Sequence, residues 1–159
     1  MDDLPQVNVT GWREWVSLTE LGVPCIEAKI DTGTKSSTLH TSFVEHYRKE
    51  GELWVRFGVN PFPDKEHMRV ICLAPVNSTR VLQVSDTHEE SFFVIESTIK
   101  IGALHTRLDL VLKSQGSMKH VMHLGRNILQ ALNIQVDPKN SYLFGELPEK
   151  KIENAPQYA

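Results

Sequence analysis

Apolar and polar residues alternate with a two-residue period through much of this chain, and this pattern restricts the fold more than any other feature. In residues 23–30, for example, Ile26, Ala28 and Ile30 fall on one face and charged residues fall on the other. Each run of this kind is expected to bury one face in a sheet. Such runs predict strands at 12–18, 23–30, 53–59, 68–76, 80–85, 91–101 and 105–113. The chain is therefore predicted to be mostly β.

Two short helices are expected to interrupt the strands. Ser42 and Glu45 fit a capping box, with Ser42 as the N-cap, and Gly51 would end the helix that they begin. The apolar spacing of residues 126–132 suits a second helix of about two turns. The whole is predicted to be a β-barrel with one or two short helices.

A single domain is expected, because 159 residues suffice for one hydrophobic core but not for two. We assign this domain to residues 11–145, with an N-terminal extension at 1–10. Near its end, residues 136–138 and 141–144 are predicted to form a closing pair of strands around a turn. Residues 146–159 carry charges and prolines without apolar periodicity, and they are predicted to be a flexible C-terminal tail.

Charge and hydropathy argue against two classes of partner. The formal net charge is −3 and no run of Lys and Arg is long enough to follow a phosphate backbone, so nucleic acid is not expected as a partner. No window approaches the roughly 18 consecutive apolar residues of a membrane span, and the first ten residues lack the features of a signal peptide. We therefore expect no membrane partner and a cytoplasmic location, or a periplasmic one if a leader was removed.

No metal or cofactor is expected. The sequence has no His-Glu-x-x-His motif, and His120 and His123 fall in a strand-like stretch, where their spacing points them to opposite faces. It also has no Gly-x-x-x-x-Gly-Lys-Ser/Thr loop, so no means of using ATP is evident. The two cysteines, Cys25 and Cys72, are expected to be buried thiols that act as small hydrophobic groups, with a single disulfide as the alternative.

The candidate for chemistry is Asp31, which directly follows an apolar strand in the segment Ile30-Asp31-Thr32-Gly33. If two such loops face each other, their aspartates must share one proton. The ionised aspartate can then activate water while the protonated one polarises a carbonyl group. The sequence holds one such triplet, so this mechanism requires two chains about a two-fold axis. Taken alone, the triplet also fits an ordinary turn.

A second segment, Leu124-Gly125-Arg126-Asn127-Ile128-Leu129, adds weight to the triplet. An apolar strand with Asp-Thr-Gly, followed later by apolar-Gly-Arg-Asn, resembles the retropepsins, the homodimeric aspartic proteases of retroviral type. Most of the chain is similar to a bacterial and archaeal group of retropepsin-like proteins that includes RimB and is often labelled ATP-dependent zinc protease. The blocks that carry this resemblance are 11–18, 21–24, 28–33, 37–40, 72–76, 122–127, 136–138 and 141–143.

The resemblance implies a retropepsin-like closed β-barrel and an aspartic-type peptidase that hydrolyses peptide bonds as a homodimer. Asp31 would be the catalytic acid and base. Its loop would be shaped by Thr32, Gly33 and Thr34, and the segment 124–127 would support that loop from beneath.

The RimB group is associated with the trimming of glutamate tails added to a ribosomal protein. The resemblance therefore implies a peptide or protein substrate that is polyanionic, such as a glutamate-rich or glutamylated tail. Several basic side chains are candidates to receive its carboxylates, although each also fits a solvated charge on a strand face. These side chains are Lys35, Arg56, Arg69, Arg80 and Arg107.

The chain departs from the retropepsin pattern at two residues. Viral members commonly place an acid two residues after the glycine, where it pairs with the later arginine; here Lys35 occupies that place, so Arg126 needs another partner or role. His123 replaces an expected aliphatic residue, and it is either a satisfied core group or a local pH sensor. The long spacing between the two motifs also indicates an insertion in the middle of the chain.

Two other functions remain open. A non-catalytic peptide-binding or assembly module with the same fold is one alternative, motivated by the departures at Lys35 and His123. A zinc hydrolase, as the label of the group suggests, is the other, although these residues offer no recognisable metal site. A peptidase would need Asp31 for cleavage, whereas a binding module would still bind its partner with Asn in that place.

Overall fold

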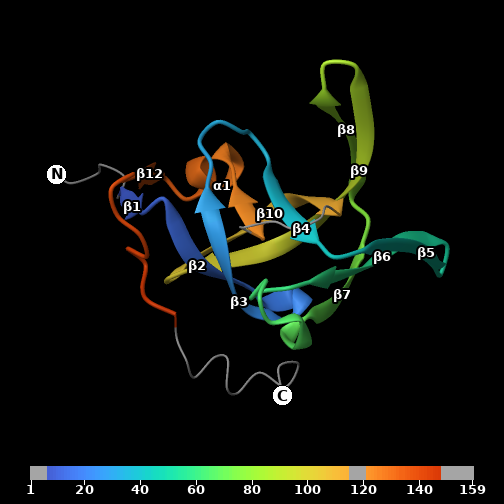
Figure 1. Ribbon diagram of the computed structural model, residues 1–159, viewed down its shortest axis with the longest axis horizontal. Coiled ribbons are helices and arrows are strands. Elements are labelled where there is room, and N and C mark those ends of the chain that lie inside the picture. Colours follow the sequence, from blue (N-terminus) through green and yellow to red (C-terminus); the bar gives the residue numbers. More distant parts are fainter. Residues whose placement is uncertain (1–6, 115–120, 148–159) are drawn as a thin grey trace.

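The computed structural model describes residues 7–114 and 121–147, and it is mostly β, as the alternation predicts. Its strands form three sheets (Figure 1). In chain order the elements are β1 (Asn8–Thr10), β2 (Arg13–Leu18), η1 (Thr19–Leu21), β3 (Val23–Ile30), β4 (Ser37–Thr41), β5 (Val44–Lys49), β6 (Glu52–Val59), η2 (Glu66–Met68), β7 (Val70–Pro75), β8 (Ser78–Ser85), β9 (His88–Ile101), β10 (Leu104–Ser114), β11 (Met122–Leu124), α1 (Arg126–Ala131) and β12 (Ile134–Val136).

The largest sheet contains seven strands in the order β10-β4-β11-β3-β2-β9-β8. Because β10 also pairs with β9, the sheet curls back toward itself. The ladder between β2 and β9 consists of one register pair, Ser17 with Lys100, and the register of β2 shifts between Val16 and Leu18. The sheet is therefore barrel-like, and the closed barrel expected from the resemblance is interrupted where the short, irregular β2 meets β9.

The three-stranded sheet β5-β6-β7 shows that one helix prediction is wrong. Residues 44–49 form β5 and pair antiparallel with β6, instead of forming the helix predicted from Ser42 and Glu45. The turn between these strands has φ values of 52° at Glu50 and 83° at Gly51, the left-handed geometry of a tight hairpin turn. Gly51 thus serves a hairpin, and the ladder to β6 outweighs the local capping signal.

The two-stranded sheet corrects the prediction for the end of the domain. β12 pairs in parallel with β1, and residues 141–144 form no strand. Two of their N–H groups bind a side chain instead: the fully buried carboxylate of Glu14 accepts hydrogen bonds from Leu143 (2.9 Å) and Phe144 (3.0 Å). A segment whose amides are held by a side chain has no need of a partner strand.

The structure can be compared with the predicted domain boundaries at both ends of the described residues. Residues 8–10, which fall within the predicted N-terminal extension, form β1. From residue 148 on, the predicted tail lies outside the described residues, so its flexibility stays a prediction. No helix among the described residues is long and apolar enough to cross a membrane.

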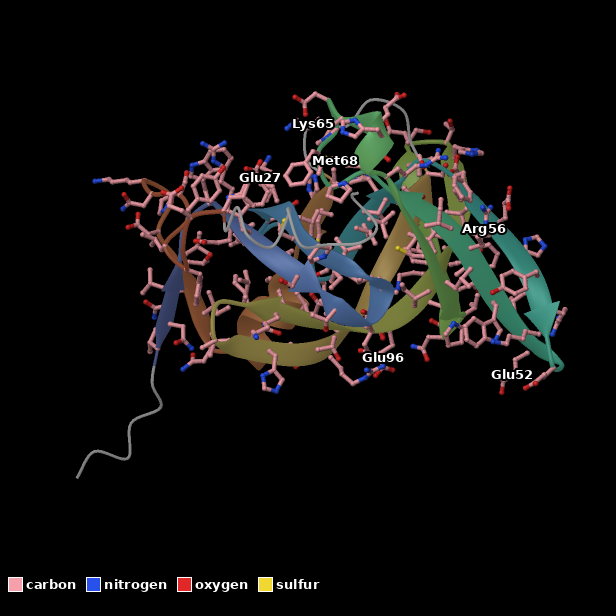
Figure 2. All side chains as sticks on the ribbon, turned by 90° about the horizontal axis from the view of Figure 1, so that it is seen from below. Glu27, Glu52, Arg56, Lys65, Met68 and Glu96 are labelled. Carbon is pink, nitrogen blue, oxygen red and sulfur yellow. The ribbon has the colours of Figure 1, made fainter. Side chains whose placement is uncertain are left out.

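Both larger sheets bury one face in a common core. Phe57 on β6, Ile95 on β9 and Leu110 on β10 are fully buried there. Side chains fill the space between the strands, whereas the β5–β6 hairpin, marked by Glu52, projects from the body of the molecule (Figure 2). A second hairpin, β8–β9, projects separately and turns at residues 86–87, between the strands predicted at 80–85 and 91–101 (Figure 1).

The two cysteines are free and buried, which confirms the expectation from the sequence. Burial raises the pKa of the Cys72 thiol to about 12. The thiol donates a hydrogen bond to the carbonyl oxygen of Leu21 at 3.3 Å. Cys72 therefore stays protonated at neutral pH and behaves as a packing group.

Candidate active-site loop

Asp31 lies at the carboxyl end of β3, where that strand runs parallel to β11. The backbone N–H of Asp31 donates a hydrogen bond of 2.8 Å to the carbonyl oxygen of Leu124, the last residue of β11. The loops that follow these two strands consequently meet. The Asp-Thr-Gly triplet and the later Gly-Arg-Asn segment, separate in the sequence, are in direct contact in the fold.

The loop after β3 folds back on the carboxylate of Asp31. Oδ1 of Asp31 accepts a hydrogen bond of 2.9 Å from the backbone N–H of Gly33. A Cβ atom at Gly33 would lie 3.1 Å from that same oxygen, which is tighter than ordinary contact. Asp31 is half-buried, while Thr32, Gly33 and Thr34 are exposed. The loop thus orients the carboxylate without covering it.

The first residues of α1 support this loop through their backbone. The N–H of Arg126 donates to the carbonyl oxygen of Thr34 at 2.9 Å, and the N–H of Asn127 donates to that of Lys35 at 3.0 Å. The first N–H groups of a helix have no acceptor within the helix itself. The loop carbonyls therefore satisfy donors that would otherwise lack a partner, and this joins loop and helix.

Arg126 also uses its side chain on the loop. Its Nη1 donates a hydrogen bond of 2.9 Å to the carbonyl oxygen of Thr32. In viral retropepsins an acid pairs with this arginine, and Lys35 occupies the place of that acid here. The carbonyl oxygen of Thr32 is the partner that Arg126 binds instead. Lys35 is exposed and forms no ion pair with any residue that the structure describes.

Gly125 is required by close packing and not by its backbone angle. Its φ of −93° is open to any residue. A Cβ atom there would lie 2.9 Å from the carbonyl oxygen of Thr34, and it would overlap the backbone of Ser36 more severely. Only a glycine lets the segment after β11 approach the loop this closely.

Ser37 is a supporting residue that the sequence reasoning missed. It is fully buried at the start of β4. Its hydroxyl donates to Oδ1 of Asn127 at 2.6 Å and accepts the backbone N–H of Gly125 at 3.0 Å. Asn127 in turn donates from Nδ2 to the carbonyl oxygen of Asp109 on β10 at 3.3 Å. One signal in the sequence could have identified Ser37: it is a polar residue on the inward face of a strand. A buried hydroxyl group needs hydrogen-bond partners.

His123 is half-buried on β11, and its ring lies edge-on against that of His40 on β4, with centroids 5.2 Å apart. Burial, followed by the charges of His123 and Lys113, lowers the pKa of His40 to about 4. Nδ1 of His40 is buried without a hydrogen-bond partner among the described residues. The group of this pair with the shifted pKa is therefore His40, which sequence reasoning did not single out. Whether His123 is a satisfied core group or a local pH sensor stays a prediction.

Within residues 7–114 and 121–147, no group of three or more His, Cys, Asp or Glu side chains is arranged to hold a metal ion. His120 lies outside the described residues. The expectation of a site without metal or cofactor stays a prediction.

Comparison with solved structures shows the fold. Lpg0085, a protein of unknown function (DUF785) from Legionella pneumophila, superposes with a TM-score of 0.72. The match covers 87% of this chain and 99% of that one, at 22% sequence identity. The two proteins therefore share the same fold over most of this chain.

Two curated relatives named "Probable alpha-L-glutamate ligase" are similar in sequence. The one from Shewanella pealeana is 31% identical over 145 residues, which make up 91% of this chain and 31% of the relative. The one from Desulfotalea psychrophila is 31% identical over 148 residues, or 93% of this chain and 32% of the relative. The chain thus spans about a third of the length of these relatives.

A protein-family model described as "RimB-like: Retropepsin-like aspartic endopeptidase RimB" matches residues 9–146. That span includes the Asp31 loop, the segment of Gly125 to Asn127 and every strand from β2 to β12. The mostly β fold and the resemblance drawn from the sequence agree with this match. The chain belongs to the RimB-like family of retropepsin-like aspartic endopeptidases.

Proposed function

We propose that this chain is an aspartic-type peptidase that hydrolyses peptide bonds with a water molecule activated by Asp31. The observation that carries the proposal is the held carboxylate: Oδ1 of Asp31 accepts the N–H of Gly33, in a loop that Arg126 and Asn127 brace from α1. A carboxylate that is oriented yet half-exposed suits a general base, which must reach the proton of a water molecule.

The active unit is a homodimer in this proposal, because each chain supplies one Asp-Thr-Gly triplet. Two Asp31 carboxylates across a two-fold axis would share one proton. The ionised carboxylate takes a proton from water, whose oxygen bonds to the carbonyl carbon, while the other carboxyl group gives its proton to the carbonyl oxygen. The carbon–nitrogen bond then breaks, and a proton passes to the departing amine.

The proposed substrate is a glutamate-rich or glutamylated protein tail. Support comes from the relatives named as probable glutamate ligases, in which a region similar to this chain makes up about a third of the protein. In this proposal, a hydrolase similar to part of such a protein cleaves the kind of glutamate linkage that an alpha-L-glutamate ligase would form. The substrate would then be a polyanionic peptide.

Cleavage of a synthetic peptide with a C-terminal run of glutamates, followed by mass spectrometry, tests this function. The wild-type chain should shorten the peptide, and Asp31→Asn should fold normally and leave it intact. Asp64→Asn, which neutralises an exposed carboxylate outside the loop, is the matched control and should cleave like the wild type. Unchanged cleavage by Asp31→Asn would overturn the proposed role of Asp31.

The competing function is a peptide-binding module without catalysis. The observation that favours it is Lys35, which stands where viral retropepsins place an acid and forms no ion pair within the described residues. This function predicts that the glutamate peptide binds the wild type and Asp31→Asn equally and is cut by neither at any pH from acidic to neutral.

A further inference from the structure

A cavity of about 660 Å³ opens beside the loop that carries Asp31. Lys35 and Ser36, which continue that loop, line one part of it, and Arg80 reaches it from β8. Strands β9 and β10 contribute Glu96, Arg107 and Asp109. The volume lies within the range of small-ligand pockets. The cavity therefore borders the end of the loop that carries the proposed catalytic carboxylate, and it is large enough for a substrate side chain.

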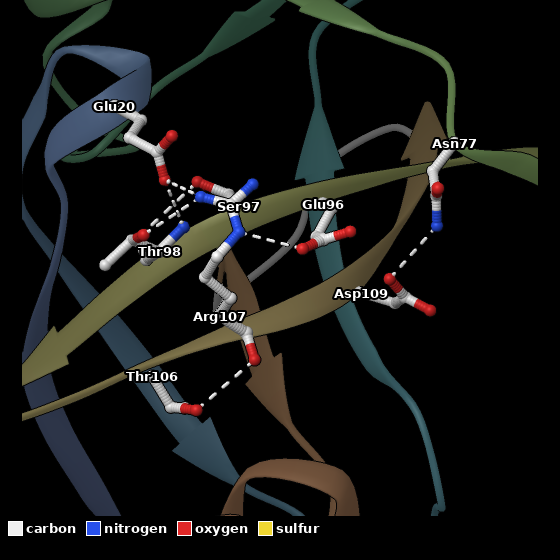
Figure 3. A network of polar contacts seen from close by, with 8 residues as sticks. All are labelled: Glu20, Asn77, Glu96, Ser97, Thr98, Thr106, Arg107 and Asp109. Carbon is white, nitrogen blue, oxygen red and sulfur yellow. Dashed lines mark hydrogen bonds and ion pairs between the residues drawn. The ribbon is translucent and has the colours of Figure 1, made fainter.

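The positive charge of Arg107 is already committed within the protein. Its Nη1 donates to Glu20 at 2.7 Å and its Nε donates to Glu96 at 2.8 Å, as Figure 3 shows. Hydrogen bonds from Thr98 and Arg107 lower the pKa of Glu20 to about 2, so this carboxylate is ionised at neutral pH. Arg107 is therefore paired with two acids, and it has no positive charge left over for a ligand.

Lys35 and Arg80 differ from Arg107 in this respect. Neither forms an ion pair with any residue in the described part of the chain. The guanidinium of Arg80 donates a hydrogen bond to the hydroxyl of Ser36, which holds it against the loop. The remaining acid of the lining, Asp109, accepts a hydrogen bond from Asn77 at 3.2 Å (Figure 3). Two cations that form no ion pair among the described residues thus stand at the side of the cavity next to the Asp31 loop.

We propose that Lys35 and Arg80 form a subsite that binds a side-chain carboxylate of the substrate, and so determine specificity for acidic residues near the bond that is cut. The inference rests on the proposed function, because the cavity gains this role only if a peptide lies across the Asp31 loop. Arg and Lys donors form charge-assisted hydrogen bonds to a carboxylate, which are stronger than those to a neutral amide. A glutamine in place of glutamate would offer both cations a neutral amide and no ion-pair partner.

The test measures binding separately from cleavage. Fluorescence anisotropy gives the Kd of Asp31→Asn chains for two labelled peptides, one with a run of glutamates and its twin with glutamines. The glutamate peptide should bind at least about tenfold more tightly, and Lys35→Met or Arg80→Met should each lower that ratio by about tenfold. Because these side chains are not deeply buried, high salt should also reduce the ratio.

Arg48→Met is the matched control. Arg48 is an exposed cation whose Nη1 donates to the carbonyl oxygen of Gly51 at the β5–β6 turn, outside the cavity. This variant should keep the full ratio of the two Kd values. Circular dichroism confirms that each variant keeps its strands, which separates a lost subsite from lost folding.

The outcomes distinguish this subsite from the proposed activity. In one outcome, the chain prefers the glutamate peptide, the preference depends on Lys35 and Arg80, and the wild type cleaves nothing. This outcome would support the proposed subsite and contradict the proposed peptidase activity. In another outcome, the wild type cleaves both peptides at equal rates, or it cleaves and the ratio of the two Kd values is unchanged in both Met variants. This outcome would support the peptidase activity and contradict the subsite. Tighter binding of a lysine-rich peptide would also contradict it, since Glu96 and Asp109 would then decide the charge preference.

Discussion

Ser37 on β4 donates a hydrogen bond of 2.6 Å from its hydroxyl group to Oδ1 of Asn127 on α1. The same hydroxyl accepts the N–H of Gly125, so one fully buried side chain joins the strand after the Asp31 loop to the segment that supports the loop.

Ser37→Ala should therefore destabilise the fold and disturb the loop. The substitution takes the acceptor from the buried N–H of Gly125, which costs about 1–3 kcal/mol in free energy of unfolding, while Oδ1 of Asn127 keeps the N–H of Ile128. Urea unfolding measures this loss, and cleavage of the glutamate peptide should fall in parallel. Ser91→Ala, at an exposed position on β9, should change stability by less than about 0.5 kcal/mol. Equal stability of the two variants would contradict the supporting role of Ser37.

Gly125→Ala and Gly51→Ala should both lower the free energy of unfolding, but for different reasons. Gly125 has an ordinary φ but no room, so an added Cβ must displace the backbone of Thr34 and Ser36, at about 1–3 kcal/mol and with loss of cleavage. Gly51 has open space but a φ of 83°, so alanine there costs about 1–2 kcal/mol in strain and leaves cleavage intact. Unfolding and peptide cleavage measured on both variants check this contrast. Full activity in Gly125→Ala would refute it.

Much of this fold could be predicted because its strands carry a local signal. The alternation in residues 23–30 matches β3 to the residue, and the apolar spacing of 126–132 located α1, because each element buries one face that the sequence itself displays. The contact between the Asp31 loop and Gly125 was predicted only from the resemblance to a family, because no periodic pattern in either segment indicates that the two segments are in contact.

The remaining features depend on contacts between distant segments. The parallel pairing of β1 with β12 joins the two ends of the described chain, and no local pattern reveals such a partner. The helix predicted from Ser42 was wrong because its capping pattern is local, whereas the ladder between β5 and β6 forms only once the hairpin closes. The hydrogen bond from Arg80 to Ser36 likewise depends on the path of the β8–β9 hairpin.

Glu14→Gln should loosen the segment that follows β12. The buried carboxylate of Glu14 accepts the N–H groups of Gly11, Leu143 and Phe144, and an amide can present only one oxygen to these donors. Loss of charge-assisted hydrogen bonds should cost about 2 kcal/mol in free energy of unfolding. Hydrogen exchange of the amides of Leu143 and Phe144 should quicken. Exchange as slow as in the wild type would count against this role, and exposed Glu89→Gln serves as the control.

Stability should fall between pH 6.5 and about pH 4 because of His40. Burial lowers the pKa of His40 in the folded chain from 6.5 to about 4, so the unfolded chain takes up a proton first as the pH drops. The contribution of neutral His40 is thus complete above pH 6.5 and is lost as the pH falls through this window.

Urea unfolding at a series of pH values measures this dependence. His40→Gln should flatten the change in free energy of unfolding across the window, because the titrating group is gone. His105→Gln, at an exposed position on β10, should keep the slope of the wild type. An identical slope in His40→Gln and the wild type would show that other groups carry the acid sensitivity.

The central claim is that Asp31 provides half of a catalytic site, and the most direct test is the distance between the two Asp31 carboxylates in a crystal structure of the active dimer. The proposed mechanism predicts oxygens about 3 Å apart, close enough to share one proton. A dimer that holds the two carboxylates too far apart to share a proton, or an active monomer, would contradict it.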